Sequence, residues 1–512
     1  MTVTKKFFAL VLACALLAAN VYAQDDWGDD SFDSGAEESA EPTFWERFKI
    51  SGDATLAGRA YVGEYANHDI KPVEMTAEAK PQFKLGLDYD GASTKFSSKI
   101  RLDEQTLRYD QEMILDEFSA DLFVGDWVLS AGKMKVVWGK GDKLHVLDNF
   151  NSNNYYDFLI PDYLDRRNAE YMFRAQYNSP LGFRVEGIYT PIMHGETYAQ
   201  KGPWKPAKID TLTNLVKQIQ AANILTAAGP NRELNQGSLA ALMNASSLSA
   251  DDLYPDTFKL EYGQFGGYVN FSLAMFDFGV SYYNGRYKQV STNMEGTIIF
   301  MAAQQNADIA QMYPTALSSA MPLLHYDKLQ AFGLDMQTAL GPCTVRAEFV
   351  YNMTSDFDGN DPWTHNNSIG YLFGFDVGIP IHNLTLNVQT TGNVVLKKDE
   401  IDNYKVLGMI PIPGTKQYDV DYDPTGCYTN HKIVVQLQDK FYYEKVTATI
   451  KAIYGIERAD FLFMPEVSFK IRDGWKITGS GLIIHNFDKE ENSEFNGWLD
   501  NSFVQLAVNY TF

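Results

Sequence analysis

The sequence lacks long apolar runs. Its one uninterrupted run, Phe7 to Ala19, is shorter than the ~20 residues that a helix needs to cross a bilayer, and no later stretch approaches that length. A membrane protein built from spanning helices is therefore excluded.

Motifs for chemistry are also scarce. The 3 cysteines and 8 histidines form no His-x-x-x-His or His-Glu-x-x-His pair, and there is no Gly-x-Ser-x-Gly elbow, phosphate loop or nucleic-acid signal. We therefore expect no enzyme, cofactor, metal or nucleic-acid partner. A site built from scattered residues stays open as an alternative, with candidates His145, His194, His325 and His485.

The first residues have the pattern of an export signal. Lys5 and Lys6 precede the apolar run, and small residues lead to a predicted cleavage after Ala23, so residues 1–23 are read as a signal peptide. A lipoprotein site at Cys14 is the weaker alternative, because apolar sequence continues beyond it. Residues 24–43 are acidic and low in apolar content, which predicts a disordered periplasmic tail.

Aromatic residues are abundant in a chain that is polar on average. They make up 14% of the sequence, while the mean hydropathy is −0.26. This combination suits a transmembrane β-barrel, whose strands alternate lipid-facing and lumen-facing residues between aromatic girdles. A large secreted β-sandwich or a carbohydrate-binding enzyme has a similar composition.

Alternation along residues 44–512 favours the barrel. In 81–90, Phe83, Leu85 and Leu87 oppose polar neighbours, and the turn Asp90-Gly91 leads into a second alternating arm. The pattern recurs along the chain and predicts an antiparallel barrel of about 18 strands, or 16 if one weak pair is loop. Short turns, including 438–440, alternate with joins that are mostly long, as expected for the periplasmic and outer rims. The long joins are 139–167, 191–261, 286–326 and 393–430.

Two stretches resemble known families. The C-terminal residues Leu506, Val508, Tyr510 and Phe512 look like the signal by which outer-membrane barrels are recognised for assembly. The block 132–167, in which a strand ending in Trp-Gly runs into an Asp-rich loop, is similar to blocks in porin-like and alginate-export-like barrels. The resemblance implies an outer-membrane channel whose partners are lipid, the barrel assembly machinery and a small solute, as a monomer or a trimer.

Loop 139–167 is the third outward loop, where trimeric porins place a constriction. Opposed charges at a narrow point would select solutes by charge and dipole. Alternatively, its glycines and aspartates form turns at the rim. The candidate constriction residues are Lys140, Asp142, Lys143, Asp148, Asp157, Asp162, Asp165, Arg166 and Arg167.

Basic residues recur on the predicted inward faces. They predict a wall that favours small, hydrophilic, anionic solutes. Pairing with inward Asp88, Asp103, Glu117, Asp121 and Glu466 would instead leave no net preference. The wall residues are Lys84, Lys95, Lys99 and Arg101 in one group and Lys451, Lys470, Arg472 and Lys476 in another.

The long loops suggest an alternative function. Residues 210–227 have apolar residues near helical spacing, and 302–312 and 315–321 are rich in alanine, so we expect short helices there. Such helices could bind a partner, which would make the protein a surface adhesin or a structural barrel. Cys343 and Cys427 are expected at opposite rims, too far apart for a disulfide.

Overall fold

The computed structural model describes most of the predicted barrel. The described residues are 46–62, 77–142, 144–227, 236–247, 251–305, 323–401, 405–406, 410–411 and 416–512. The predicted signal peptide 1–23 and acidic tail 24–43 lie outside them, as does Lys143.

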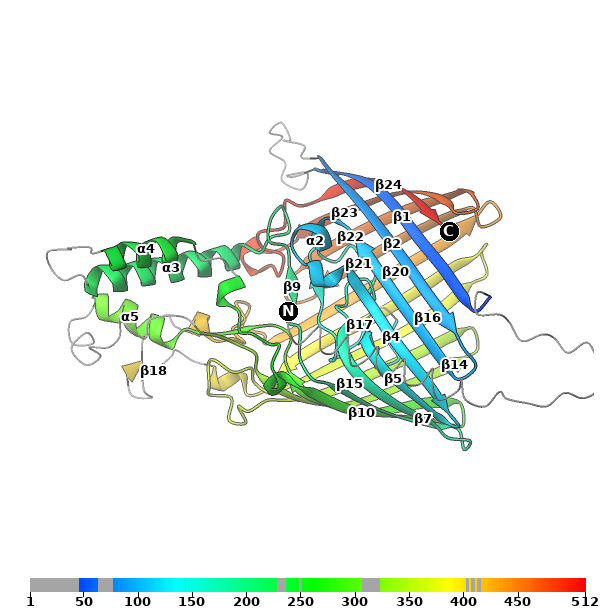
Figure 1. Ribbon diagram of the computed structural model, residues 1–512, viewed down its shortest axis with the longest axis horizontal. Helices are drawn as coiled ribbons and strands as arrows, with labels where there is room; N and C mark the ends of the chain where they lie inside the picture. Colours follow the sequence, from blue (N-terminus) through cyan, green and yellow to red (C-terminus); the bar gives the residue numbers. More distant parts are fainter. Residues whose placement is uncertain are drawn as a thin grey trace, which may run out of the picture.

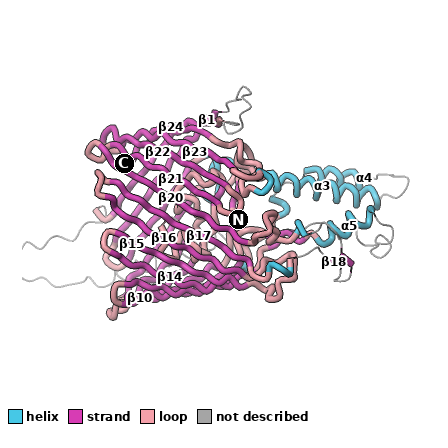
Figure 2. The backbone as a smooth tube through the Cα atoms, turned by 180° about the vertical axis from the view of Figure 1, so that it is seen from behind, coloured by secondary structure: helices cyan, strands magenta, loops and turns pink. Residues whose placement is uncertain are grey.

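Eighteen antiparallel strands form one closed sheet, seen from two sides in Figures 1 and 2. Strand β1 pairs with both β2 and β24, which closes the barrel. The predicted fold and the count of 18 are therefore confirmed. The barrel strands, in order around the wall, are β1 (Phe48–Tyr61), β2 (Ala77–Asp90), β3 (Thr94–Leu102), β4 (Leu115–Val124), β5 (Trp127–Met134), β7 (Glu170–Asn178), β8 (Phe183–Thr190), β10 (Gln264–Leu273), β11 (Phe276–Arg286), β14 (Lys328–Leu340), β15 (Cys343–Met353), β16 (Ser368–Ile379), β17 (Leu384–Val395), β20 (Thr429–Phe441), β21 (Val446–Gly455), β22 (Asp460–Arg472), β23 (Trp475–Asn486) and β24 (Phe503–Thr511).

Shorter elements lie in the loops of the outer end. Helices α3, α4 and α5 project well beyond the barrel at that end (Figure 1). Helix α3 agrees with the predicted helix 210–227, and α5 begins before the predicted 302–312; residues 315–321 lie outside the described part. These elements are α2 (Glu104–Arg108), η1 (Gln111–Met113), β6 (Asn154–Tyr155), β9 (Thr197–Tyr198), α3 (Ala207–Ala227), α4 (Gln236–Ser247), η2 (Asp251–Leu253), η3 (Leu260–Tyr262), β12 (Ser291–Asn293), α5 (Glu295–Gln305), β13 (Leu323–His325), η4 (Lys398–Glu400), β18 (Lys405–Val406), β19 (Ile410–Pro411), η5 (Lys416–Tyr418) and η6 (Glu490–Asn492).

The outer face of the wall is apolar. On β24, Val504 and Leu506 are 55% and 60% exposed, whereas the intervening Gln505 points inward and contacts Arg59. The same alternation exposes large apolar side chains around the whole barrel, which is the surface that lipid would cover. Among the described helices, none combines the length and the apolar character needed to cross a bilayer.

One predicted turn is wrong. The prediction placed the turn between β20 and β21 at 438–440, but the strands continue and the chain reverses at 442–445. Tyr442, Tyr443 and Glu444 have φ values of 50°, 57° and 60°, so three non-glycine residues adopt the left-handed conformation that usually marks glycine or asparagine. The sequence therefore carries no ordinary signal for this turn. The two cysteines among the described residues are free thiols, with Cys343 beginning β15 and Cys427 exposed in an outer loop.

One side of the barrel is filled with apolar side chains. Residues of strands β5 to β15 meet Trp138, Leu147 and Phe150 from the loop after β5, and together they form a buried cluster. The lumen is consequently solid on that side. The cluster comprises Met134, Val136, Trp138, Leu147, Phe150, Met172, Ile188, Tyr268, Tyr283, Leu329, Ala331 and Val350.

Candidate functional site

The loop between β5 and β7, residues 135–169, folds into the lumen; we call it the inward loop. Its first part is held by Trp138, which is 2% exposed and donates from Nε1 to Glu186 Oε1 on β8 at 2.8 Å. The indole also lies 5.6 Å from the Tyr268 ring in a stacked arrangement. Burial of such a large side chain stabilises this segment inside the barrel.

A single carboxylate on the wall holds the neck of the inward loop. Glu348 on β15 has a side chain that is 0% exposed. Its Oε1 accepts a hydrogen bond from Gly141 N at 2.6 Å and lies 3.0 Å from His145 Nδ1, while Oε2 accepts one from Val146 N at 2.8 Å. Gly139 has φ +107°, and a Cβ there would lie 2.2 Å from Glu348 Oε1, so this approach requires glycine.

Strand β17 adds a second anchor. Asn387 donates to Asp142 Oδ2 at 3.1 Å, and Gln389 donates to the Asp142 backbone oxygen at 2.5 Å. The neck is thus fixed by amides and a carboxylate from two strands of the wall.

Ion pairs hold the distal part of the inward loop against the opposite wall. Asp157 accepts from both terminal nitrogens of Arg59 on β1, at 2.6 and 2.9 Å, and from Lys80 Nζ on β2 at 2.8 Å. Burial acts to raise the pKa of Asp157, but the Arg59 guanidinium outweighs it and the pKa is lowered. Asp165 pairs with Lys84 on β2 at 3.0 Å and Asp162 with Lys451 on β21 at 3.4 Å. The loop therefore spans the lumen between two regions of the wall.

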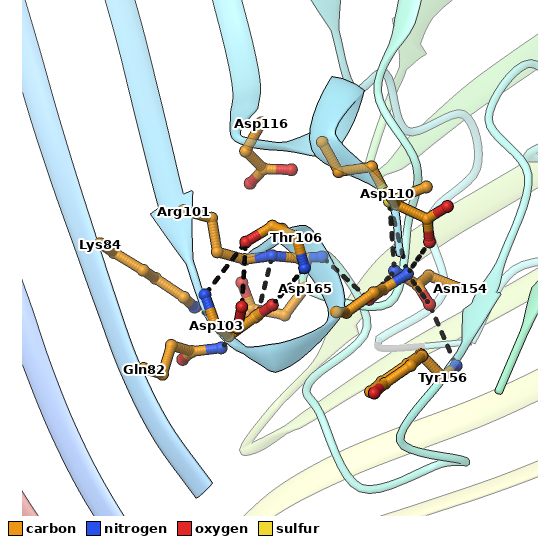
Figure 3. A network of polar contacts seen from close by, with 12 residues as sticks. Gln82, Lys84, Arg101, Asp103, Thr106, Asp110, Asp116, Asn154, Tyr156 and Asp165 are labelled. Carbon is orange, nitrogen blue, oxygen red and sulfur yellow. Dashed lines mark hydrogen bonds and ion pairs between the residues drawn. The ribbon is translucent and has the colours of Figure 1, made fainter. Parts of the chain in front are cut away.

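A neighbouring outer loop braces this arrangement (Figure 3). Asp103 caps helix α2 by accepting from Thr106 N at 3.0 Å, and it pairs with Arg101 Nε at 3.1 Å. From within that helix, Gln105 Oε1 accepts a hydrogen bond from Asn154 Nδ2 of the inward loop at 2.9 Å. Helix α2 is thereby connected to both the wall and the inward loop.

The end of the inward loop is fixed by a buried polar network. Arg167 pairs with Asp148 at 3.1 Å and donates to Asn153 Oδ1 at 3.0 Å, while the Tyr163 hydroxyl donates to Asp148. Burial opposes the charge of Arg167, yet the Asp148 carboxylate outweighs it and raises the pKa of Arg167. These buried contacts restrict the end of the loop to one arrangement.

The inward loop leaves an off-centre space that we call the lumen cavity. Its volume is about 850 Å³, and it lies between the inward loop and strands β17 to β24. A smaller cavity of about 230 Å³ lies on the other side of the loop, against β1, β2 and β3. The wall of the lumen cavity carries amides and hydroxyls, among them Asn387, Gln389, Thr391, Gln436, Thr449, Thr478, Ser480 and Gln505.

The candidate constriction residues separate into groups. Asp142, Asp162, Arg166 and Arg167 line the lumen cavity, whereas Asp157 and Asp165 line the smaller one. Asp148 is buried behind them, Lys140 lies in the neck near Asp335, and Lys143 is outside the described residues.

The predicted basic wall does not come together as one surface. Lys84 and Lys451 contact the inward loop, as described above. In the first group Lys99 pairs with Glu117 at 3.0 Å and Lys95 with Asp90 at 3.4 Å. In the second group Lys470, Arg472 and Lys476 lie at the short turn between β22 and β23, where Lys470 pairs with Asp473 at 3.2 Å.

Sequence reasoning missed a charged cluster at the outer mouth. Asp327 Oδ2 accepts from Ser291 Oγ at 2.8 Å and lies 2.7 Å from His365 Nδ1, while Oδ1 lies 2.9 Å from His325 Nε2. The cluster joins two long outer loops, and Asp421 and Asp419 lie near it. Residues this far apart in sequence give no local signal; His325 alone was noted. Within the described part of the chain, no group of three or more potential ligands is placed to hold a metal ion.

The charge state of this cluster predicts a pH dependence. The hydrogen bond with Asp327 raises the pKa of His325 above 6.5, and the same partner, opposed by burial, raises that of His365. A raised histidine pKa stabilises the fold at pH values below 6.5, and this stabilisation is lost as pH rises through the raised pKa. Burial and the charge of Asp421 raise the pKa of Asp419 to about 7, so its ionisation also weakens the cluster as pH rises from 3.8.

We therefore expect the outer loops to loosen as the pH rises above about 6.5, through the raised pKa values of the two histidines. Hydrogen exchange of residues 354–367 should become faster, beyond the intrinsic pH dependence of exchange, as the pH rises above about 6.5 in the full-length protein. In His365→Gln the change should be much smaller, and an equal change in both proteins would contradict the assignment.

Comparisons with known proteins give structural similarities only. No protein-family model matches the sequence, and no curated protein does. OccAB4 of Acinetobacter baumannii is 9% identical with a TM-score of 0.43, covering 91% of this chain and 97% of its own. OccK11 (OpdR) of Pseudomonas aeruginosa is 8% identical with a TM-score of 0.43, covering 91% and 96%. OmpF of Salmonella typhi is 7% identical with a TM-score of 0.36, covering 91% and 97%. At these scores the likeness carries no inference about this chain, whose barrel is established by its own strand pairing.

Proposed function

We propose that this protein is an outer-membrane channel for passive or facilitated diffusion of small hydrophilic solutes. The inward loop is its constriction, and the lumen cavity is the narrow part of its path. The observation that carries this proposal is the set of contacts that hold the loop across the lumen, from Glu348 at its neck to Arg59 and Lys451 at its far side.

Purified protein in planar bilayers tests the proposal directly. Deletion of 142–165 should raise the single-channel conductance, because it removes the segment that separates the two cavities. Unchanged conductance after the deletion would refute the constriction. A complete lack of conductance in the native protein would refute the channel.

The paired state of the basic residues bears on ion selectivity. Several predicted wall bases have acidic partners within 4 Å, which reduces the field that an anion would feel across the whole path. We propose that any preference of the channel for anions arises from individual charged groups in the lumen and not from the predicted basic wall. Reversal potentials under a salt gradient measure this, and clear cation selectivity would refute any anion preference.

A role as a surface adhesin is the second candidate. It is favoured by the projection of α3, α4 and α5 beyond the barrel (Figure 1) and by exposed Leu239 and Met243 on α4. Proteoliposomes separate the two functions. Solute flux supports the channel, and binding to host or envelope ligands without flux supports the adhesin.

A further inference from the structure

A basic pocket lies at the short-turn end of the barrel, which Figure 1 shows opposite helices α3, α4 and α5. It lies between the turn that joins β20 to β21 and the turn that joins β22 to β23, and its volume is about 340 Å³. We call it the inner pocket. Its lining includes three lysines, Lys445, Lys470 and Lys476, together with the carboxylate of Glu444.

The lysines of β22 and β23 in the inner pocket face the lumen and not the lipid. On β22, Val467, Phe469 and Ile471 are exposed on the outer face of the wall, so the intervening Lys470 points inward. Lys476 is the cross-strand partner of Lys470 and therefore lies on the same face. A phospholipid headgroup outside the barrel would approach the opposite face of these strands.

The positive charge of the inner pocket is only partly compensated. Lys470 and Lys476 lie directly opposite each other, and like charges in such a position repel. Lys470 pairs with Asp473 at 3.2 Å, but Asp473 is fully exposed at the turn, and a pair of this kind is weak. Within the described part of the chain, Lys445 and Lys476 form no ion pair. An anion bound between the lysines would relieve their repulsion.

The chain itself contains a segment of complementary charge. Residues 24–43, which lie outside the described part, contain eight acidic residues and no lysine or arginine. Five of the eight lie between Asp25 and Asp33. The turns at the inner pocket, 440–445 and 470–476, contain five basic and two acidic residues. The segment and the pocket are therefore opposite in net charge.

The acidic segment precedes the strand that closes the barrel near the inner pocket. Lys476 pairs in register with Asn509 of β24, and Asn509 pairs with Thr55 of β1. Lys476 is thus two strand spacings from β1, about 10 Å, and Thr55 is about 23 Å along β1 from its first residue, Phe48. The distance along the wall from the start of β1 to Lys476 is consequently about 25 Å.

The length of the acidic segment matches this distance. Asp33 and Asp25 precede Phe48 by 15 and 23 residues. Flexible chains of these lengths have root-mean-square spans of about 20–29 Å. Covalent attachment gives such a chain an effective concentration on the order of millimolar at the pocket. Even a weak ionic contact would therefore form for much of the time.

We propose that the acidic segment 24–43 docks on the inner pocket, where its carboxylates bind Lys445, Lys470 and Lys476. The docked segment lies across part of the inner mouth of the barrel and places negative charge there. This interaction goes beyond the proposed channel, because it joins two parts of the chain whether or not a solute passes.

Carbodiimide coupling tests the docking in the full-length protein, because it joins a carboxylate to an amine only when the two are in contact. At 0.1 M salt, mass spectrometry should find amide bonds from residues 25–41 to Lys470 and Lys476. Their yield should fall about fivefold at 1 M salt, where the Debye length decreases from about 10 Å to about 3 Å. Absence of these bonds, or an equal yield at both salt concentrations, would overturn the proposal.

Variants of the lysines separate the inner pocket from general attraction to the rim. Combining Lys470→Gln with Lys476→Gln should lower coupling to the remaining Lys445 about fivefold, as expected for the loss of two exposed ionic contacts. Lys95 is a matched control, because it lies at the same rim, 3.4 Å from Asp90, and outside the inner pocket. Lys95→Gln should leave the yield unchanged, and an equal loss in both variants would overturn the docking site.

The lipid around the barrel provides a test of a different occupant. In vesicles of phosphatidylcholine and of phosphatidylglycerol, the coupling yield should be the same. A loss of coupling in phosphatidylglycerol alone would assign the lysines to anionic headgroups and would overturn the proposal.

A peptide with the sequence of residues 24–43 adds a measurement of current. Applied to protein that lacks these residues, it should reduce the current from the short-turn side and not from the side of α3, α4 and α5. A peptide with asparagine and glutamine in place of the acidic residues should not, and equal block by both peptides would overturn the proposal. If the native protein does not conduct, the channel proposal fails, while the coupling experiment still decides the docking.

Discussion

Replacing Glu348 with alanine should raise the single-channel conductance and make it noisier. The substitution removes the acceptor for Gly141 N and Val146 N and the partner of His145. Hydrogen bonds to a charged group contribute about 1.5–3 kcal/mol each, so the neck of the inward loop would lose most of its attachment to β15. The measurement is conductance in planar bilayers, together with hydrogen exchange of residues 141–146.

Two further variants separate this effect from general damage to the wall. Glu348→Gln keeps the shape and one acceptor oxygen, so its conductance should lie between those of Glu348→Ala and the native protein. Asp376→Asn alters another wall carboxylate, on β16, which pairs with Arg346 of the neighbouring strand β15 and not with the inward loop. It should leave conductance near native. Native conductance in Glu348→Ala would refute the anchoring role.

Replacing Gly52 with leucine should lower the yield of closed barrels. Gly52 N and O form hydrogen bonds with Phe512 O and N at 2.9 and 3.0 Å, where β1 meets the end of the chain. A Cβ on Gly52 would lie 2.1 Å from the Phe512 ring, so any side chain must displace that ring. Such overpacking costs about 1–3 kcal/mol in a core, and here it falls on the seam that completes the sheet.

The same strand offers the control. A Cβ on Gly58 meets nothing within 4 Å, so Gly58→Leu should fold normally. Folded barrels that resist unfolding by detergent at room temperature can be counted for each variant by gel mobility before and after heating. A normal yield for Gly52→Leu would contradict the steric account.

Phe512 is a predicted assembly signal and also packs over Gly52 at the seam between β1 and β24. Phe512→Ala separates these two roles. If Phe512 is an assembly signal, its loss should lower the amount of protein in the outer membrane while refolding in vitro stays efficient. Combining it with Gly52→Leu should restore refolding in vitro, because the clash is relieved, but not assembly in cells. Normal assembly of Phe512→Ala would remove the support for a signal.

The strands could be predicted because a period of two is a local property. Successive residues of β24 point alternately to the outside and to the lumen of the barrel. Short turns such as Asp473-Gly474 contain the residue types that favour turns. The turn at Tyr442 and Tyr443 could not be predicted from the sequence, because it lacks such residue types.

The sequence indicated which loop to examine as the candidate site, but not which wall residues anchor that loop. The order of the loops located 139–167 as the third outward loop, and its charges were apparent. Glu348, which is 202 residues from Val146, could not be identified as the anchor from the sequence. Several other strand carboxylates occupy inward-facing positions of the same alternating pattern. Arg166 and Arg167 likewise look equivalent in sequence, and only the position of Asp148 separates them.

The filled side of the barrel divides the chain into two successive parts with different tolerance to change. Barrel-strand residues of the buried cluster all lie between Met134 and Val350, whereas barrel-strand residues that line the lumen cavity begin at Asn387 and continue to Gln505. Apart from the inward loop, the earlier part supports the fold, and the later part forms the wall that a solute contacts. Homologous replacement of the segment from β17 onwards should therefore alter solute preference, while exchanges within the barrel strands β5 to β15 should affect mainly folding yield.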